Sequence, residues 1–215
     1  MKIEQQEIAR AGCLFIVSGP SGAGKTSICT PALEEFEDVR PSVSITTREP
    51  RRDEVEGKDY CFVDDARFDR MIADDEFVEW AEVHGSRYGT SRRSIEDALA
   101  AGRDLLLDID VQGARQVKAV YPDCVAVFLL PPSRDRLEAR LKSRGTESLD
   151  ALALRLNAAC EEIAAFVDYD YVIVNEDLDV AVKQFISILR GERQRVGRLG
   201  DDERRMILDT FGKPS

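Results

Sequence analysis

The sequence predicts an α/β protein whose central sheet is parallel and doubly wound, and three observations support this. Four short runs are apolar without a polar alternate face, which is typical of strands buried on both sides of a parallel sheet. A helical pattern follows each run, and repeated strand-then-helix units place helices on both faces of such a sheet. The segment 44–90 breaks this rhythm with a dense mixture of Arg, Asp, Glu and Thr, so we expect an inserted sub-domain there.

Each expected strand ends at a residue type that stops a strand. The apolar runs lie at 13–17, 105–107, 125–130 and 171–174. They end, in order, at a Gly-rich turn, at Asp108, at Pro131-Pro132 and at Asn175. The expected helices follow at residues 25–36, 112–120, 133–144 and 177–196. Because ligands of such sheets bind at the carboxyl ends of the strands, we expect the functional site at these turns.

The predicted organisation combines one core with an insertion and two tails. Its parts are an N-terminal tail at 1–11, a core at 12–43 and 91–196, a substrate-binding sub-domain at 44–90, a helical lid within the core at 133–160, and a charged, frayed tail at 197–215. The sub-domain has a short strand candidate at 60–63. The lid is expected because the segment 145–168 is helical but begins with the polar stretch Gly145–Ser148, as in a mobile flap.

Composition limits the classes of partner. The chain has 215 residues and is 43% hydrophobic, which suits one globular domain with a core of its own. There are 30 Lys and Arg against 41 Asp and Glu, so the net charge is −11. Such a surface argues against a binder of nucleic acid or anionic membranes, since phosphate backbones attract basic surfaces. A small anionic substrate needs only a local basic pocket and is not excluded.

The sequence favours a reducing, cytoplasmic location. Its longest strongly apolar stretch, Cys124–Leu130, is far shorter than the ~18 residues of a spanning helix. Residues 1–10 mix charges and lack the apolar centre of a signal peptide. The five cysteines are odd in number and show no CxxC spacing, and His84 is the single histidine, which argues against a zinc site.

A glycine-rich loop after the first strand carries the most specific motif, GxxxxGK[ST]. Its residues are Gly19, Pro20, Ser21, Gly22, Ala23, Gly24, Lys25 and Thr26. The glycines allow the backbone to wrap around phosphate, and loop N–H groups with the helix N-terminus supply positive potential. Lys25 can reach the β- and γ-phosphates, and the Thr26 hydroxyl can bind Mg²⁺. An ordinary Gly-rich turn would meet few of these constraints, so the motif indicates a nucleoside triphosphate but not the phosphate acceptor.

The segment 44–52 combines hydroxyls with three arginines. Arg48, Arg51 and Arg52 follow the hydroxyls of Ser44, Thr46 and Thr47. Arginine holds phosphate through two parallel hydrogen bonds, which suits a terminal monophosphate. On composition alone, a solvated charged loop is the simpler interpretation in a chain that is 33% charged.

Four further residues could form a pocket that selects guanine. Guanine presents N1–H and N2–H₂ donors, which a carboxylate such as Glu79 or Asp108 accepts, and acceptors that hydroxyls such as those of Ser44 and Thr90 satisfy. Adenine would leave a buried carboxylate facing a lone pair, which is costly. Spacing along the sequence does not show whether these four side chains converge.

Together these motifs resemble those of the guanylate kinase family. The resembling segments are GPSGAGKT, SITTREPRRDEVEGKDYCFV, FVEWAEVHGSRYGT, LLLDIDVQGARQV, RLKSRGTES and YVIVNEDLD. They occur in order over about residues 12–195, and TTRxPR, YGT and DIDxQG are specific in themselves. The resemblance implies a P-loop kinase that uses ATP and Mg²⁺ to convert GMP to GDP in purine nucleotide metabolism, with the insertion as its GMP-binding sub-domain. It leaves open the oligomeric state and the choice between GMP and dGMP.

The resemblance also implies roles for the residues at matching positions. It assigns the ATP phosphates to loop 19–26 and places the adenine near Asn175. It assigns the GMP phosphate to Arg48, Arg51, Tyr60 and Tyr88, and the guanine to Ser44, Glu79, Thr90 and Asp108. The catalytic residues would be Lys25 and the charge-neutralising arginines Arg140, Arg144 and Arg155. Thr26 would bind the metal directly, and Asp110 would orient its water shell.

Three details qualify the resemblance. Arg52-Asp53 stands where the family often has Pro-Gly, and Ile45 where it often has His. A monophosphate is already an anionic nucleophile, so no strong base is needed and His84 is expected to be a surface or packing residue. Arg140 and Arg144 are four residues apart and share a helix face, whereas Arg155 lies beyond the flexible 145–148 stretch and is expected to arrive only when the flap closes.

Three alternatives differ in class. A non-catalytic guanylate-kinase-like interaction module would carry a degraded phosphate loop. A kinase of another phosphorylated acceptor would have no use for both Glu79 and Asp108. A regulatory GTPase would carry an NKxD segment, which this sequence lacks.

Overall fold

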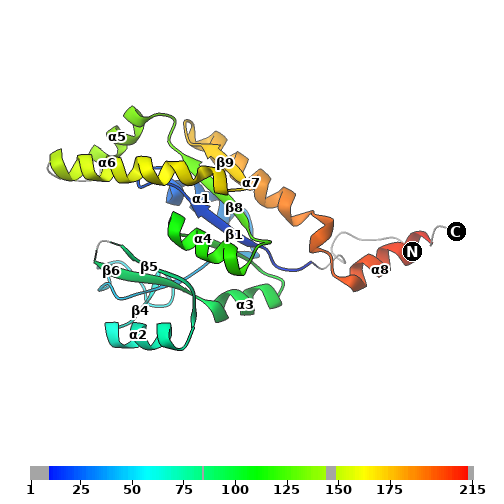
Figure 1. Ribbon diagram of the computed structural model, residues 1–215. Helices are drawn as coiled ribbons and strands as arrows, with labels where there is room; N and C mark the ends of the chain where they lie inside the picture. The colour runs from blue at the N-terminus through cyan, green and yellow to red at the C-terminus, as the bar shows by residue number, and fades with distance from the viewer. Residues whose placement is uncertain (1–9, 84, 144–148, 213–215) are drawn as a thin grey trace.

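A five-stranded parallel sheet forms the centre of the molecule and confirms the predicted α/β fold (Figure 1). The computed structural model describes residues 10–83, 85–143 and 149–212. In sheet order the strands are β2 (Val39–Pro41), β7 (Asp104–Asp108), β1 (Leu14–Ser18), β8 (Val125–Leu130) and β9 (Tyr171–Val174). After β1 the chain first forms β2 and β7 on one side of this strand, and then β8 and β9 on the other side. The carboxyl end of β1 therefore lies at the switch point where ligands of such sheets bind.

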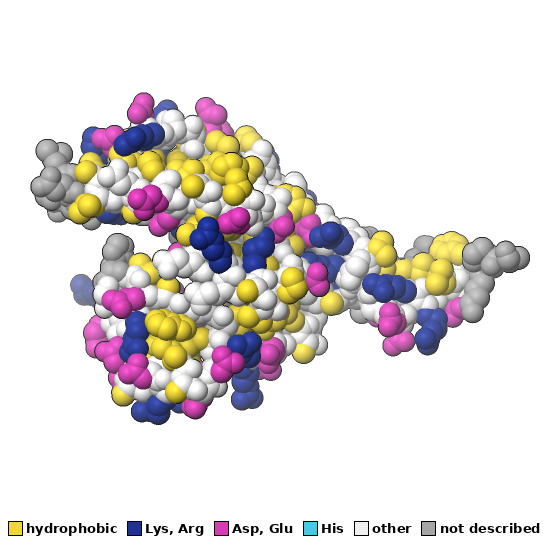
Figure 2. Space-filling view, viewed as in Figure 1, with side chains coloured by type: hydrophobic (Ala, Val, Ile, Leu, Met, Phe, Trp, Pro, Cys, Tyr) yellow, Lys and Arg dark blue, Asp and Glu magenta, His cyan; other side chains and the backbone are white. Residues whose placement is uncertain are grey.

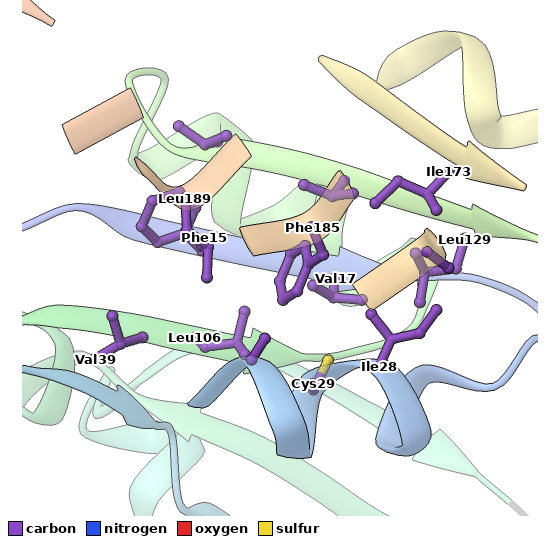
Figure 3. Packing of buried hydrophobic residues seen from close by; sticks show 14 of the residues in the cluster. Phe15, Val17, Ile28, Cys29, Val39, Leu106, Leu129, Ile173, Phe185 and Leu189 are labelled. Carbon is purple, nitrogen blue, oxygen red and sulfur yellow. The ribbon is translucent and has the colours of Figure 1, made fainter. Parts of the chain in front are cut away.

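Helices cover both faces of this sheet. One face packs against α1 (Lys25–Glu34) and α7 (Leu178–Arg193), and the other against α3 (Arg92–Ala100) and α4 (Val111–Val120). Alternate residues of β1 serve the two layers: Phe15 and Val17 face the first, and Leu14 and Ile16 the second. Figure 3 shows the first layer, where Phe185 of α7 lies against Val17. Burial on both faces is the reason these strands are apolar throughout.

The four strands expected in the main sheet occur within a residue or so of their predicted bounds. β2 was missed because only Val39 of its three residues is buried, so it lacks an apolar run. The helices α3 and α2 (Asp65–Ala73) were also not predicted individually. Both are nine residues long and begin at capping side chains, Ser91 for α3 and Asp64 for α2.

The inserted segment forms a sheet of its own. Its order is β4 (Tyr60–Phe62), β3 (Ser44–Thr46), β6 (Ser86–Ser91) and β5 (Phe77–Val83). Helix α2 packs on this sheet through a separate small core of Ile45, Phe68, Met71 and Phe77. Figure 1 shows the small sheet and α2 as a lobe beside the main sheet.

Helices α5 (Arg134–Ser143) and α6 (Leu149–Ile163) form a third packed unit. Their own core consists of Leu137 and Leu141 of α5 with Leu156 and Ala159 of α6. A short 3₁₀ helix, η2 (Ala164–Asp168), leads from α6 to β9. The space-filling view is hollowed between this helical unit and the lobe of the small sheet (Figure 2).

The chain after α7 corrects the expectation of a frayed tail. It forms the 3₁₀ helix η3 (Val196–Arg198) and the eleven-residue helix α8 (Asp201–Phe211). Acidic residues in the first turn of α8 favour the helix by interacting with its N-terminal dipole. Figure 1 shows α8 standing away from the rest of the molecule, and none of its residues is buried.

A buried ion cluster ties both ends of the core to β7. The fully buried carboxylate of Asp104 accepts hydrogen bonds from Arg10 at 2.6 and 2.8 Å and from the backbone N–H of Cys13 at 2.8 Å. Arg193 of α7 lies 3.2 Å from the same carboxylate. Such a buried charge needs these partners to offset its desolvation.

The structure bears on the predictions about cysteines and membrane-spanning segments. All five cysteines are free, and Cys13, Cys29 and Cys124 are buried. Among the residues that the structure describes, no helix combines the length and apolar character needed to cross a membrane.

Candidate functional site

The phosphate loop occupies the turn between β1 and α1 and lines a cavity of about 380 Å³. Gly24 is the N-cap of α1 and adopts a left-handed conformation, with φ of 95°. A Cβ there would lie 2.3 Å from Nδ2 of Asn175, so glycine is required by both backbone and space. Gly24, Lys25 and Thr26 all line the cavity, which places the positive end of a helix at its wall.

Lys25 lies between the phosphate loop and the end of β7. Its Nζ donates to the carbonyl of Gly19 at 2.9 Å and lies 3.8 Å from Oδ1 of Asp108. Partial burial in the cleft raises the pKa of Asp108, and the nearby lysine opposes that rise. The ammonium group thus lies beside the loop, from which it could turn to a phosphate.

Asn175 and Arg140 support the phosphate loop through hydrogen bonds to its backbone carbonyl groups. The buried Asn175 side chain donates from Nδ2 to the carbonyl of Ala23 at 2.7 Å. Arg140 of α5 donates to the carbonyl of Asn175 at 2.9 Å and to those of Gly22 and Ala23 at 3.4 Å. The side-chain amide of Asn175 therefore supports the loop, and its predicted place near adenine stays a prediction. A cavity of about 260 Å³ beside these residues is also lined by Gly24 and Leu178.

The predicted acceptor residues converge on a neighbouring cavity of about 200 Å³. Five of them line it: Ser44 of β3, Tyr60 of β4, Glu79 of β5, Tyr88 of β6 and Asp108 of β7. The strands of the small sheet bring the first four together, because β3 pairs with both β4 and β6 and β6 pairs with β5. This cavity also lies beside the main sheet, through Asp108 and Asp110.

Glu79 is the buried carboxyl group of this cavity. It pairs with Thr90 across β5 and β6, and the Thr90 hydroxyl donates to Oε1 of Glu79 at 2.5 Å. Burial raises the pKa of Glu79 to about 7, with Asp110 adding to the rise and the Thr90 hydrogen bond opposing it. On the far side, a Cβ at Gly113 of α4 would lie 2.7 Å from Oε2 of Glu79. The carboxyl group is therefore packed between Thr90 and Gly113.

The predicted phosphate-binding arginines lie in the turn after β3. Arg48 donates to Oε1 of Glu54 at 2.8 Å, and its guanidinium carbon lies 5.3 Å from the centroid of the Tyr60 ring. Hydrogen bonds to Glu54 and Tyr88 hold the pKa of Arg48 above its usual value. The backbone N–H of Arg51 donates to the other oxygen of Glu54, also at 2.8 Å. Arg48 thus lies against the tyrosines that line the acceptor cavity.

The cavity of the phosphate loop and the cavity of Glu79 adjoin each other. Both are lined by Tyr60, Val83, Asp108, Ile109 and Asp110. Asp108 lies near Lys25 on one side and lines the cavity of Glu79 on the other. A phosphate held by the loop and a second nucleotide held by the small sheet would therefore share one cleft.

The lid arginines only partly match their prediction. Arg155 of α6 donates to the Ser21 hydroxyl at 3.3 Å, so its side chain reaches the phosphate loop. Helix α6 packs on α5 through their shared core, and the arrival of Arg155 on closure of a flap stays a prediction. Arg140 holds loop carbonyls from behind, and Arg144 and His84 lie outside the described residues.

The sequence-based prediction did not include three residues of the site. Glu54 accepts hydrogen bonds from the Arg48 side chain and from the backbone N–H of Arg51 in the turn after β3. Its position three residues after Arg51 could have indicated this, because a side chain at that spacing can close a turn. Glu162 of α6 lines the phosphate cavity, where partial burial raises its pKa and Lys25 opposes the rise. Gly113 leaves room for Glu79, a contact between distant segments that no local pattern encodes.

The oxygen donors at the phosphate loop fit Mg²⁺, which prefers oxygen ligands and keeps several waters. Thr26 brings a hydroxyl and Asp110 a carboxylate to the same cavity. Within the described ranges, no three His, Cys, Asp or Glu side chains cluster as a complete metal site. The protein would therefore supply part of the shell and leave the remainder to phosphate oxygens and water.

A phosphate loop at the switch point of a five-stranded parallel sheet, beside a second cavity that contains a buried carboxyl group, defines a P-loop kinase. The guanylate kinase family profile matches residues 12–192. A guanylate kinase of Syntrophotalea carbinolica is 49% identical over 92% of this chain and 94% of its own length. One of Methylococcus capsulatus is 46% identical over 94% and 98%. The crystal structure of guanylate kinase from Anaplasma phagocytophilum superposes with a TM-score of 0.75 at 34% identity, over 95% of this chain and 97% of its own. The chain belongs to the guanylate kinase family, as the resemblance predicted.

Proposed function

We propose that this protein transfers the γ-phosphoryl group of ATP to GMP, giving ADP and GDP. The observation that carries the proposal is the shared wall of the two cavities, where Asp108 lies between the donor lysine and the buried acceptor carboxyl. One cavity holds a phosphate loop, and the other holds a carboxyl group suited to guanine. Since GMP and ATP are cytoplasmic metabolites, we also place the enzyme in the cytoplasm.

Guanine recognition rests on Glu79 with three neighbours. The Glu79 carboxylate can accept from N1–H and N2–H₂ of guanine while Thr90 holds it from behind. Ser44 and Asp108 line the same cavity and can meet the remaining edges of the base. Adenine would offer N1 as an acceptor to a carboxylate and lose this match.

The acceptor phosphate would bind at the opening of this cavity. Arg48 and Arg51 supply positive charge from the turn, and the hydroxyls of Tyr60 and Tyr88 complete a polar set around the phosphate. Arginine pairs with two phosphate oxygens at once, which fixes the direction of the nucleophilic oxygen. We regard the four-stranded sheet as the GMP-binding sub-domain on these grounds.

The transfer step needs positioning and charge neutralisation rather than a base. The GMP phosphate oxygen attacks the γ-phosphorus in line with the departing ADP. In our proposal, the Lys25 ammonium leaves the Gly19 carbonyl for the ATP phosphates, and Arg155 approaches them from its contact with Ser21. Arg140 contributes through its hold on the loop, and Arg144 stays a predicted participant from the resemblance.

Mg²⁺ would be held by the Thr26 hydroxyl, with Asp110 orienting its water shell. When bound, the ion supplies neutralising charge to the phosphate oxygens of ATP. The helices α5 and α6 form the proposed lid, since they share a core of their own beside the phosphate loop. Their approach to the small sheet would exclude water, which would otherwise accept the phosphoryl group.

A nucleotide screen tests the function. ATP is supplied with GMP, dGMP, AMP, CMP, UMP or IMP, with and without Mg²⁺, and ADP release is measured in a coupled assay. We expect Mg²⁺-dependent turnover with GMP to exceed that with AMP, CMP and UMP by at least 100-fold. Equal turnover of several bases would contradict the guanine assignment, and absence of ADP release would favour a non-catalytic interaction module.

A further inference from the structure

The turn that carries the acceptor arginines is closed by one carboxylate with two partners. Oε1 of Glu54 accepts from Arg48, and Oε2 accepts from the backbone N–H of Arg51, each at 2.8 Å. The backbone N–H of Glu54 in turn donates to the carbonyl of Arg51 at 3.1 Å. One side chain therefore fixes both a guanidinium group and the backbone beneath a second arginine.

Arg48 is fixed from the other side as well. Its guanidinium donates to the carbonyl of Glu49 at 2.7 Å and lies over the Tyr60 ring, which lines both cavities. The side chains of Arg48 and Glu54 are each 17% exposed, so the turn partly covers both groups. The geometry indicates an arginine oriented before any phosphate arrives.

We propose that Glu54 is a positioning residue that pre-organises Arg48 and Arg51 to receive the phosphate of the acceptor nucleotide. This inference rests on the proposed function, because it assigns the acceptor phosphate to these arginines. Without Glu54, binding would have to immobilise Arg48 and order the turn, and that ordering opposes association. Glu54 itself need not touch the nucleotide.

Simple electrostatics predicts the opposite sign. Glu54 carries a negative charge near the place where a dianionic phosphate binds, so its removal would tighten binding if charge alone mattered. Positioning predicts weaker binding, because the amide of Glu54→Gln has one oxygen for two donors and its N–H₂ would face the second donor. The direction of the change in KM therefore decides between the two.

The test is steady-state kinetics of Glu54→Gln with each substrate varied in turn. We expect KM for GMP to rise roughly tenfold, with kcat within about threefold of wild type and KM for ATP unchanged. The matched control is Asp53→Asn, which removes an equal charge from the exposed neighbouring residue and should leave KM for GMP within twofold. A fall or no change in KM for GMP in Glu54→Gln would overturn the proposal, as would an equal rise in both KM values.

A double-mutant cycle adds a second readout. Because Glu54 acts through both Arg48 and Arg51, Glu54→Gln should raise KM for GMP less in an Arg48→Ala or an Arg51→Ala background than in wild type. An undiminished tenfold rise in both backgrounds would overturn the proposal. Should Glu54→Gln fail to fold, Glu54→Asp keeps the charge but shortens the reach by one methylene group, and the same rise confined to GMP is expected.

Failure of the proposed function would look different. If the wild type preferred another nucleoside monophosphate, GMP would be the wrong acceptor. Glu54→Gln would then be measured with the preferred nucleotide, and a rise in its KM without a rise in KM for ATP would still support the role of Glu54. Since the phosphate is common to all these acceptors, the result for Glu54 does not depend on the base.

Discussion

Replacing Glu79 by Gln removes one of the two carboxylate oxygens that can accept hydrogen bonds in the proposed GMP cavity. In the structure, Oε1 of Glu79 already accepts from Thr90 at 2.5 Å, and Oε2 is packed against Gly113, so the side chain has little freedom to turn. The amide N–H₂ of Gln would then face a guanine donor. A mismatched buried pair of this kind costs ~1–3 kcal/mol.

That cost corresponds to a loss of roughly 10- to 100-fold in kcat/KM for GMP, at tenfold per 1.4 kcal/mol. IMP lacks the 2-amino group and should lose less, so the ratio of GMP to IMP is the sharpest measure. The assay is coupled ADP release at pH 8, above the pKa of about 7, where most wild-type Glu79 is ionised. Glu82→Gln, an exposed change on the same strand, serves as the control and should leave the ratio unchanged. A GMP-to-IMP ratio within twofold of wild type in Glu79→Gln would refute this account of guanine recognition.

Three further predictions follow from the same geometry. GMP affinity, measured by calorimetry, should rise as pH increases through about 7, because burial raises the pKa of Glu79 and guanine binds its ionised form; superimposable profiles for wild type and Glu79→Gln would attribute the rise to the GMP phosphate instead. Lys25→Ala should lower kcat by roughly 100-fold or more, equivalent to ~3 kcal/mol of charge stabilisation, while GMP affinity by calorimetry stays near wild type; a variant with half of wild-type kcat would contradict the assignment. Arg155→Ala should lower kcat much more than it raises either KM, since in our proposal the side chain leaves Ser21 to meet the phosphoryl group during transfer; a collapse of GMP affinity with unchanged kcat would place Arg155 in the acceptor site.

The main sheet could be predicted because its strands carry a local signal. Strands such as β8 are buried on both faces, so every residue is apolar and the run is visible without knowledge of its neighbours. The small sheet gave a weaker signal. Its strands β3 and β4 have three residues each, and β4 is only partly buried, so their pattern resembles that of a charged loop.

The site was predicted residue by residue but not as a geometry. Glu79 and Thr90 are eleven positions apart, and only the antiparallel pairing of β5 with β6 brings them into contact. Gly113 contributes from another part of the chain by having no side chain, which a sequence pattern cannot distinguish from an ordinary helical glycine. The contact of Arg155 with Ser21 could not be predicted, because it depends on how α6 packs on α5 rather than on distance along the chain.

The position of β1 in the main sheet has a consequence for how the protein is made. Of the strands that the structure describes, β1 is synthesised first, yet its hydrogen-bonding partners are β7 and β8, with Leu14 beside Leu105 and Phe15 beside Val125. Until residues 125–130 emerge, the most buried strand of the molecule has at least one unpaired edge, whereas every strand of the small sheet has been synthesised by residue 91. We therefore expect the small sheet to assemble first during translation. Nascent β1 should be the segment that most needs to be shielded by chaperones.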